Sequence, residues 1–230
     1  MEDRLEILLS AQEISVIVTR LAKELRLAYG FGEEPLVVGD KSPVGEGEPL
    51  VVISILNGAF VFTADLIRAL ALPVELDFMR LASYGRRDAP AQVVSILEDV
   101  TIDIKGRNVL IIEDIVDRGL TLMAARERLE TKGPADIKVC SLLLRRSGAG
   151  GSSEEAASVD FVGKYLAEGF VVGYGMDFKE RYRELPGLYT LPAEASATAP
   201  SVTAPSVTAP SVTASPLGGD MNKDGGDCGS

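Results

Sequence analysis

Acidic side chains, a glycine and a hydroxyl group gather within one short stretch of the chain, residues 109–121. They follow one another in the order Glu113, Asp114, Asp117, Gly119 and Thr121. A glycine in a tight turn lets the backbone approach a ligand closely, and the exposed N–H groups of a following helix attract a phosphate. Because two neighbouring carboxylates would repel that phosphate, we expect Glu113 and Asp114 to bind sugar hydroxyls or a divalent cation instead. The stretch therefore predicts a site for a phosphorylated sugar.

The apolar residues at 109–112 come directly before these acids. A short continuous apolar run is typical of a strand that is buried on both faces of a parallel sheet. Ligands of open α/β sheets bind at the carboxyl ends of the strands, which is where Glu113 and Asp114 are expected. A structural interpretation also fits, because Asp117 is a suitable cap for a helix expected at 122–129 and the two acids would then be solvated loop residues. The local pattern leaves both interpretations open.

Strand and helix patterns alternate along much of the chain. A capping box at 10–13 begins an amphipathic helix that is expected to run to Gly30. Further buried strands are expected at 50–56 and 137–144, and a helix is expected at 60–70. We therefore predict an α/β fold with a central parallel sheet that is flanked by helices.

A polar loop at 83–91 separates two strand patterns, at 73–81 and 93–97. We predict that these two strands and their loop form a mobile flap over the site. Residues 147–158 are expected to be a flexible connection, because their glycine run lacks the Lys-Ser or Lys-Thr pair of a nucleotide-binding P-loop. The remaining expected elements are short strands at 160–162 and 170–174 and a charged turn or short helix at 177–184.

Composition and charge exclude several classes of protein. The chain has 230 residues, 46% of them hydrophobic, which is enough for one domain with a substantial core. A net charge of −11 without a long basic run argues against nucleic-acid binding. There is no histidine, and Cys140 and Cys228 are the only cysteines, so neither a zinc site nor a disulfide framework can be built. Because the apolar stretches are short and the N-terminus is acidic, we expect a cytoplasmic protein without a membrane span.

The composition changes abruptly at residue 192. A Thr-Ala-Pro-Ser-Val repeat runs from 198 to 213 and is followed by a Gly/Asp-rich end. Such a segment cannot bury enough apolar surface to offset its ordering entropy. We predict one folded domain at 1–191 and a disordered low-complexity tail at 192–230. Within the domain, residues 32–48 are expected to be an irregular insertion.

Three further segments accompany the run VLIIEDIVDRGLT at 109–121. They are LNGAF at 56–60, RLASYG at 80–85 and FVVGYGMD at 170–177. In this order, the four segments resemble the pyrophosphate loop, the mobile Ser-Tyr loop, the phosphoribosyl-pyrophosphate (PRPP) signature and the purine pocket of type I phosphoribosyltransferases, in the form found in 6-oxopurine (hypoxanthine-guanine) enzymes. The likeness covers roughly residues 10–191. It implies a twisted, parallel central sheet flanked by helices, with a small hood and a mobile flap.

The resemblance also implies a reaction. Enzymes of this kind transfer the 5-phosphoribosyl group of PRPP to N9 of hypoxanthine or guanine, which gives IMP or GMP and pyrophosphate in purine salvage. They depend on Mg²⁺ and are usually homodimers or homotetramers. Two alternatives stay open at this point: a non-catalytic regulator that keeps the fold and senses PRPP or a nucleotide, and a transferase that prefers xanthine or another purine.

By resemblance, most of the site residues serve PRPP. Asp117 would be the catalytic base near purine N7. The residues that would bind the ribose and its 5′-phosphate are Glu113, Asp114, Asp117, Arg118, Gly119, Leu120 and Thr121. Those that would bind pyrophosphate are Asn57, Gly58 and Arg183, and the lid residues are Ser83 and Tyr84. The Mg²⁺ ligands would be Glu113, Asp114 and Asp177.

The purine would be bound by Arg145, Phe170, Val171 and Asp177. Phe170 would stack on the ring, and the main chain of Val171 and Asp177 would read its edge. The main departure from the family is Arg145, where a lysine typically donates to the 6-oxo group; arginine is a larger, planar donor and is not equivalent. Asn57 is a second departure, since a basic residue is frequent there. Both departures concern purine preference more than reaction class.

Overall fold

The computed structural model describes residues 5–31, 49–84, 93–145, 159–167 and 169–192. Four sequence predictions lie wholly or largely outside these described residues. They are the insertion at 32–48, most of the flap loop, the connection at 147–158 and the tail from residue 193 onwards.

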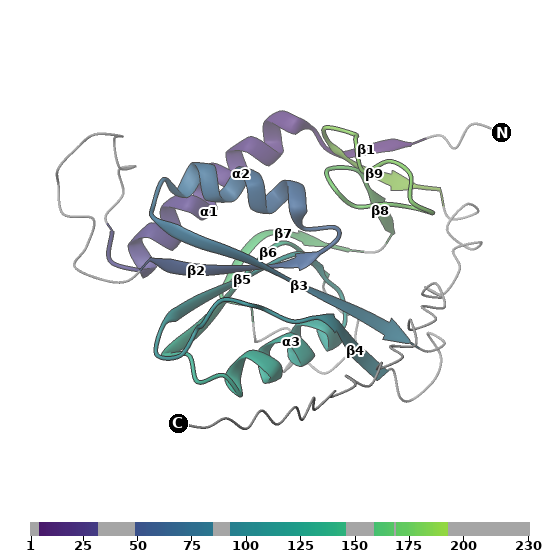
Figure 1. Ribbon diagram of the computed structural model, residues 1–230. Helices are drawn as coiled ribbons and strands as arrows, with labels where there is room; N and C mark the ends of the chain where they lie inside the picture. The colour runs from purple at the N-terminus through teal and green to yellow at the C-terminus, as the bar shows by residue number, and fades with distance from the viewer. Residues whose placement is uncertain (1–4, 32–48, 85–92, 146–158, 168, 193–230) are drawn as a thin grey trace, which may run out of the picture.

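Six strands form the central sheet (Figure 1). In spatial order they are β4 (Val93–Glu98), β3 (Val74–Tyr84), β2 (Leu50–Leu56), β5 (Asn108–Val116), β6 (Asp136–Arg145) and β7 (Phe161–Leu166). Neighbouring strands from β3 to β7 run parallel, and β4 runs antiparallel to β3. The predicted α/β fold with a mostly parallel sheet is confirmed.

Helices cover both faces of this sheet. α1 (Ala11–Ala28) and α2 (Phe60–Leu70) lie on one face, and α3 (Leu120–Glu130) lies on the other (Figure 1). Successive residues of β5 alternate between the two layers: Leu110 packs in the cluster of α1 and α2, and Val109 in the cluster of α3. The apolar run at the start of β5 is therefore buried on both faces, as predicted. No helix in the described part of the chain is long and apolar enough to cross a membrane.

α1 begins at the predicted capping box. The Ser10 hydroxyl oxygen accepts a hydrogen bond from the Glu13 N–H at 3.3 Å, and the Glu13 carboxylate accepts one from the Ser10 N–H at 2.8 Å. These two bonds satisfy donors that the helix itself leaves without partners. The helix then buries one apolar stripe, made by Ile14, Val18, Leu21 and Leu25.

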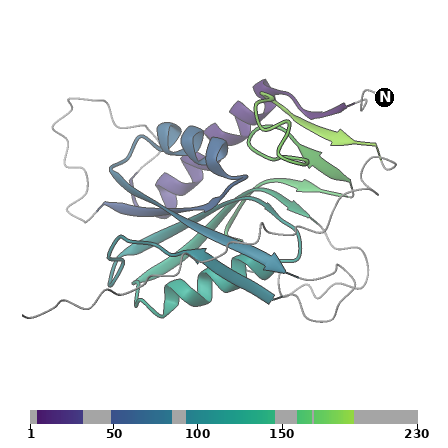
Figure 2. The same cartoon turned by 45° about the vertical axis from the view of Figure 1, so that its right-hand side comes forward.

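A second, three-stranded antiparallel sheet forms the predicted hood. Its strands, in spatial order, are β1 (Glu6–Leu9), β9 (Leu188–Leu191) and β8 (Phe170–Val172). Figure 2 shows the hood beyond the carboxyl ends of the parallel strands, next to the start of α1. The segment between β8 and β9, residues 173–187, is called the hood loop below.

Two element boundaries near the acids differ from the sequence prediction. β5 continues to Val116, so Glu113 and Asp114 lie within the strand and not after it. The reason is backbone pairing with β6, which places Glu113 opposite Ser141 although the side chains have become polar. α3 begins at Leu120, and its N-cap is Gly119 with a φ of 75°. The interpretation of Asp117 as the helix cap is therefore wrong.

Other elements also differ in length from the prediction. The two flap strands pair antiparallel from Leu81 opposite Ile96 to Tyr84 opposite Val93, so β3 ends three residues later than expected. β7 is longer than predicted, and β8 ends at Val172. The charged segment at 177–184 is a turn and not a helix, closed by a backbone bridge between Phe178 and Arg181.

Candidate active site

Two adjacent carboxylates lie in the second half of β5 and are shielded from solvent to different degrees. Glu113 is buried and Asp114 is half-buried, and the Ile115 N–H donates to Asp114 Oδ1 at 2.9 Å. Burial, followed by the charge of Asp114, raises the pKa of Glu113 well above its ordinary value. Burial also raises the pKa of Asp114, although hydrogen bonds and the charge of Arg183 oppose it. Because Glu113 Oε2 has no hydrogen-bond partner among the described residues, the pair is suited to receive a donor or cation from a ligand.

The turn formed by Asn57 and Gly58 lies directly against these carboxylates. A Cβ added to Gly58 would lie 1.8 Å from Asp114 Oδ2, so a side chain at this position would displace the carboxylate. On the hood side, a Cβ added to Gly175 would lie 2.4 Å from the carbonyl oxygen of Gly58. Asn57 is exposed, and the peptide bond between Leu56 and Asn57 is cis. Backbone atoms of the hood loop and of this turn are therefore in close contact.

Arg183 and Asp177 of the hood loop face the same region. Arg183 Nη2 lies 2.8 Å from Asp177 Oδ1, and Arg183 Nη1 donates to the Gly175 carbonyl at 2.8 Å. The positive charge of Arg183 also acts on Asp114, where it opposes the rise in pKa that burial causes. Three segments that are far apart in sequence therefore meet near the carboxyl end of β5.

The turn from β5 into α3 carries the residues predicted to bind the 5′-phosphate. Asp117 and Arg118 are exposed, and Gly119 is buried in the left-handed conformation. Leu120 and Thr121 begin α3 and are half-buried. The first N–H groups of a helix have no partner within the helix, and the helix dipole favours an anion there. The turn therefore has the geometry of an anion site.

Arg145 connects this turn to the hood. Its Nε lies 3.0 Å from Asp117 Oδ1, in an ion pair that lacks hydrogen-bond alignment. Its Nη1 and Nη2 donate to the carbonyl oxygens of Ala167 and Gly169, each at 3.0 Å. One guanidinium thus joins the predicted base to the segment that leads directly into Phe170.

The predicted purine residues lie in the hood. Phe170 is half-buried at the start of β8, and Val171 is buried. The ring of Phe178 packs edge-on against Phe170, with centroids 5.5 Å apart and planes at 74°. The sequence analysis did not select Phe178 as a site residue, because it lies among charged residues at 177–184. A single apolar residue within a charged segment was the signal that could have indicated its packing role.

The structure describes the backbone of the two predicted lid residues but not their side chains. Ser83 and Tyr84 end β3, opposite Val94 and Val93 of β4. Their side chains, and the loop that follows them, lie outside the described residues. Their role as a lid stays a prediction.

The chemistry of the acids fits the Mg²⁺ that the resemblance implies. Carboxylate oxygens are hard ligands, and Glu113 Oε2 is buried without a protein partner. Within the described ranges, however, no three acidic, histidine or cysteine side chains are grouped to hold a metal ion, and Asp177 pairs with Arg183 instead. The three predicted ligands do not form a preassembled cage. Mg²⁺ commonly binds through one or two carboxylates together with water and substrate phosphates, an arrangement that Glu113 and Asp114 can supply.

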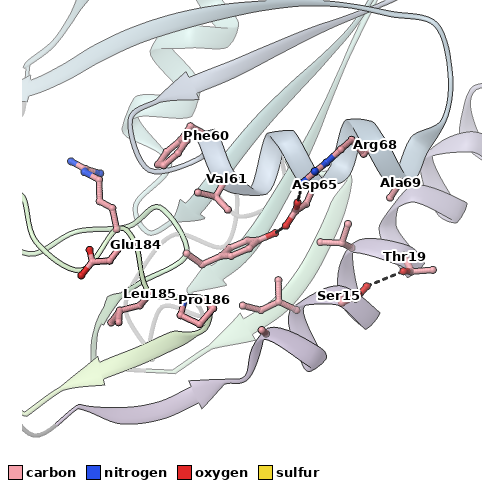
Figure 3. A pocket seen from close by; sticks show the side chains of 15 residues that line it. Ser15, Thr19, Phe60, Val61, Asp65, Arg68, Ala69, Glu184, Leu185 and Pro186 are labelled. Atoms are coloured by element: carbon pink, nitrogen blue, oxygen red, sulfur yellow. Dashed lines mark hydrogen bonds and ion pairs between the residues drawn. The ribbon is translucent and has the colours of Figure 1, made fainter.

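A separate cleft of about 700 Å³ opens between α1, α2 and the end of the hood loop (Figure 3). Arg183 lines it, but the residues of β5 and of the β5–α3 turn do not. Within it, the Tyr174 hydroxyl donates to Asp65 at 2.6 Å, and Asp65 also pairs with Arg68. The cleft therefore shares Arg183 with the predicted pyrophosphate residues, but it does not include the paired acids or the predicted 5′-phosphate turn.

The fold is that of a phosphoribosyltransferase. The family model described as the phosphoribosyl transferase domain matches residues 5–179. The chain is 39% identical over 185 residues to the hypoxanthine-guanine phosphoribosyltransferase of Mycobacterium avium, covering 80% of this chain and 84% of that protein. It is 36% identical over 186 residues to the hypoxanthine phosphoribosyltransferase of Salmonella typhimurium, covering 81% and 94%.

A solved structure agrees with these relatives. The hypoxanthine phosphoribosyltransferase of Trypanosoma cruzi superposes with a TM-score of 0.71 at 37% identity, covering 86% of this chain and 96% of that one. The chain belongs to the hypoxanthine-guanine phosphoribosyltransferases of the type I family. The family that the four sequence motifs predicted is thus confirmed.

Proposed function

We propose that the protein is a purine salvage enzyme that transfers the 5-phosphoribosyl group of PRPP to N9 of hypoxanthine or guanine. The products are IMP or GMP and pyrophosphate. One observation carries the proposal: paired acids, a glycine turn and an Arg–Asp pair from three distant segments meet near the carboxyl end of β5. A ligand with ribose hydroxyls beside a pyrophosphate needs acceptors and cationic donors side by side.

PRPP would be held from both ends. The carboxylates of Glu113 and Asp114 accept hydrogen bonds from the ribose hydroxyls. Backbone N–H groups and the Thr121 hydroxyl bind the 5′-phosphate at the turn made of Asp117, Arg118, Gly119, Leu120 and Thr121. Asn57, the Gly58 backbone and Arg183 bind the pyrophosphate. The close contact between Gly58 and Asp114 supports this proposal, because the turn assigned to pyrophosphate adjoins a carboxylate assigned to the ribose.

Asp117 would act as the general base. As the bond to N9 forms and pyrophosphate leaves, Asp117 takes the proton from N7 of the purine. Arg145 holds this carboxylate in place through their 3.0 Å contact. Phe170 stacks on the purine, supported from its edge by Phe178, and the main chain of Val171 and Asp177 reads the purine edge. Ser83 and Tyr84 close over the reactants and exclude water from the oxocarbenium-like ribose.

Mg²⁺ would be held by Glu113 and Asp114 together with oxygens of PRPP, with Asp177 close by. When bound, it neutralises the charge that develops on the leaving pyrophosphate. We further propose that the protein acts in the cytoplasm as a homodimer or homotetramer, and that it has no nucleic-acid or membrane partner, in keeping with its net charge of −11.

A preference for xanthine or another purine is a second candidate, and Arg145 is the observation that favours it. The terminal nitrogens of Arg145 already donate to the carbonyls of Ala167 and Gly169. Such a guanidinium has less freedom to follow the 6-oxo group than the lysine of the family.

An assay of pyrophosphate release tests both candidates. The purified full chain is incubated with Mg²⁺ and PRPP together with hypoxanthine, guanine, xanthine or adenine, and PRPP binding is measured separately. We expect turnover with hypoxanthine and guanine. Turnover with xanthine alone would replace the first candidate by the second, and PRPP binding without turnover of any base would show a non-catalytic regulator.

A further inference from the structure

We propose that Tyr174 and Asp65 are positioning residues for the pyrophosphate side of the site, although neither belongs to the predicted machinery. The Tyr174 hydroxyl donates to Asp65 Oδ2 at 2.6 Å and so joins the hood loop to α2. Figure 3 shows Asp65 on α2 with its dashed contacts in the cleft. The inference rests on the proposed assignment of Asn57, Gly58 and Arg183 to pyrophosphate.

The two elements joined by this bond carry the two halves of that subsite. The turn of Asn57 and Gly58 leads directly into α2, and the Phe60 N–H donates back to the Asn57 carbonyl at 3.3 Å. α2 is in turn fixed to the sheet by a buried hydrogen bond of 2.7 Å between the hydroxyls of Thr63 and Ser54. Asp65 therefore projects from a rigid support that begins at the pyrophosphate turn.

On the hood side, Tyr174 directly precedes Gly175, whose backbone contacts Gly58. The Gly175 N–H also donates to the Arg183 carbonyl at 3.0 Å, and the Arg183 side chain returns to the Gly175 carbonyl at 2.8 Å. Movement of Tyr174 away from α2 would therefore move Gly175 and Arg183 together. The bond between Tyr174 and Asp65 fixes their distance from the Gly58 turn.

The backbone at Tyr174 indicates that its side chain is needed there. Tyr174 has a φ of 50°, between Gly173 at 97° and Gly175 at 99°. Residues with a Cβ rarely adopt this region, and glycine would suit the local backbone better. Tyr174 is only 6% exposed and packs in the core shared by α1 and α2, so burial and the bond to Asp65 offset the backbone cost. Burial, followed by the bond to Asp65, raises the pKa of Tyr174, so the phenol stays protonated and acts as the donor.

Kinetics of two single variants and their double variant test the inference. Because a hydrogen bond to a carboxylate is lost, Tyr174→Phe and Asp65→Ala should each raise the KM for PRPP and the inhibition constant for pyrophosphate by about five- to tenfold. The KM for hypoxanthine should change by less than about twofold, and the double variant should be no worse than either single one. Asp65→Asn keeps an oxygen acceptor and should restore the values close to those of the unmodified chain.

Two control variants show whether the kinetic effect comes from the bond between Tyr174 and Asp65. Arg68→Ala removes the exposed partner of Asp65 and leaves the bond to Tyr174, so it should change neither constant. Arg183→Ala tests the pyrophosphate subsite itself and should raise the KM for PRPP. If Arg183→Ala raises it but Tyr174→Phe lowers only the melting temperature, the positioning inference is wrong. If Arg183→Ala leaves it unchanged, the subsite assignment fails instead. Equal rises for PRPP and hypoxanthine in Tyr174→Phe would also overturn the inference.

Discussion

Replacing Gly58 by alanine tests whether the pyrophosphate turn must approach Asp114 closely. The new Cβ would lie 1.8 Å from Asp114 Oδ2, whereas ordinary contact begins at 3.4 Å. The turn and the carboxylate must therefore separate by about 1.6 Å, since close-packed interiors leave no spare space. Asp114 cannot easily rotate away, because its Oδ1 accepts the Ile115 N–H at 2.9 Å. A misplacement of about 1 Å can lower a rate about 100-fold, so kcat/KM for PRPP should fall about 100-fold, or about 2.7 kcal/mol.

Initial rates at varied Mg-PRPP and saturating hypoxanthine measure this effect, with thermal unfolding recorded alongside. Gly30→Ala is the matched control, because Gly30 has a φ of 80° with nothing within 4 Å of its added Cβ. The control should lose about 1–2 kcal/mol of stability from the left-handed backbone and keep its kcat/KM. If Gly58→Ala retains kcat/KM within about threefold, the close approach has no part in PRPP binding and the geometric reasoning is refuted.

Three further predictions concern purine choice, pH and the tail. Arg145→Lys keeps a cation beside Asp117 but gives up the bonds to Ala167 and Gly169, so the ratio of hypoxanthine to adenine use should shift by about tenfold; identical profiles would show that Arg145 does not read the purine. Burial acts to raise the pKa of Asp77, but N–H groups of residues 102, 78 and 101 outweigh it and hold that pKa below 3.8. The ionised Asp77 carboxylate therefore stabilises the folded state above pH 3.8, and this stabilisation is lost as the pH falls through the lowered pKa. Asp77→Asn should lower the melting temperature at neutral pH, with the difference closing in acid; a constant difference in acid would contradict this. Removing residues 192–230 should leave melting temperature and rate unchanged, and a large drop in either would contradict the tail prediction.

Local sequence patterns were sufficient for the elements that position the site. The capping box of Ser10 and Glu13 predicted the start of α1, and the apolar run before Glu113 predicted a strand buried on both faces. These features are encoded by neighbouring residues, so they are legible in the sequence. The end of β5 could not be predicted in this way, because its pairing with β6 continues past the point where the side chains become polar.

The features that could not be predicted from the sequence depend on contacts between segments that are far apart in the chain. The first hood strand, β1, pairs with β9 across almost the whole domain, with Glu6 opposite Thr190, and neither strand has a local signal strong enough to predict it. Arg145 was expected to bind the purine, and the structure adds hydrogen bonds to the backbone carbonyls of residues 167 and 169. Every residue has a backbone carbonyl, so the residue types at 167 and 169 could not indicate these bonds. The bond from Tyr174 to Asp65 likewise joins residues whose types alone give no reason to pair them.

The central claim is that Asp117 is the base of a PRPP-dependent purine transferase, and the Asp117→Asn variant tests it most directly. Asparagine has nearly the same shape and keeps an oxygen that can face Arg145, so the 3.0 Å contact has a counterpart and the turn is preserved. The measurement is the rate of IMP formation from hypoxanthine and Mg-PRPP, together with PRPP affinity by calorimetry. We predict that kcat falls by about 10²–10⁴ while PRPP affinity changes by less than about threefold. An unchanged kcat would contradict the assignment of Asp117 as the base.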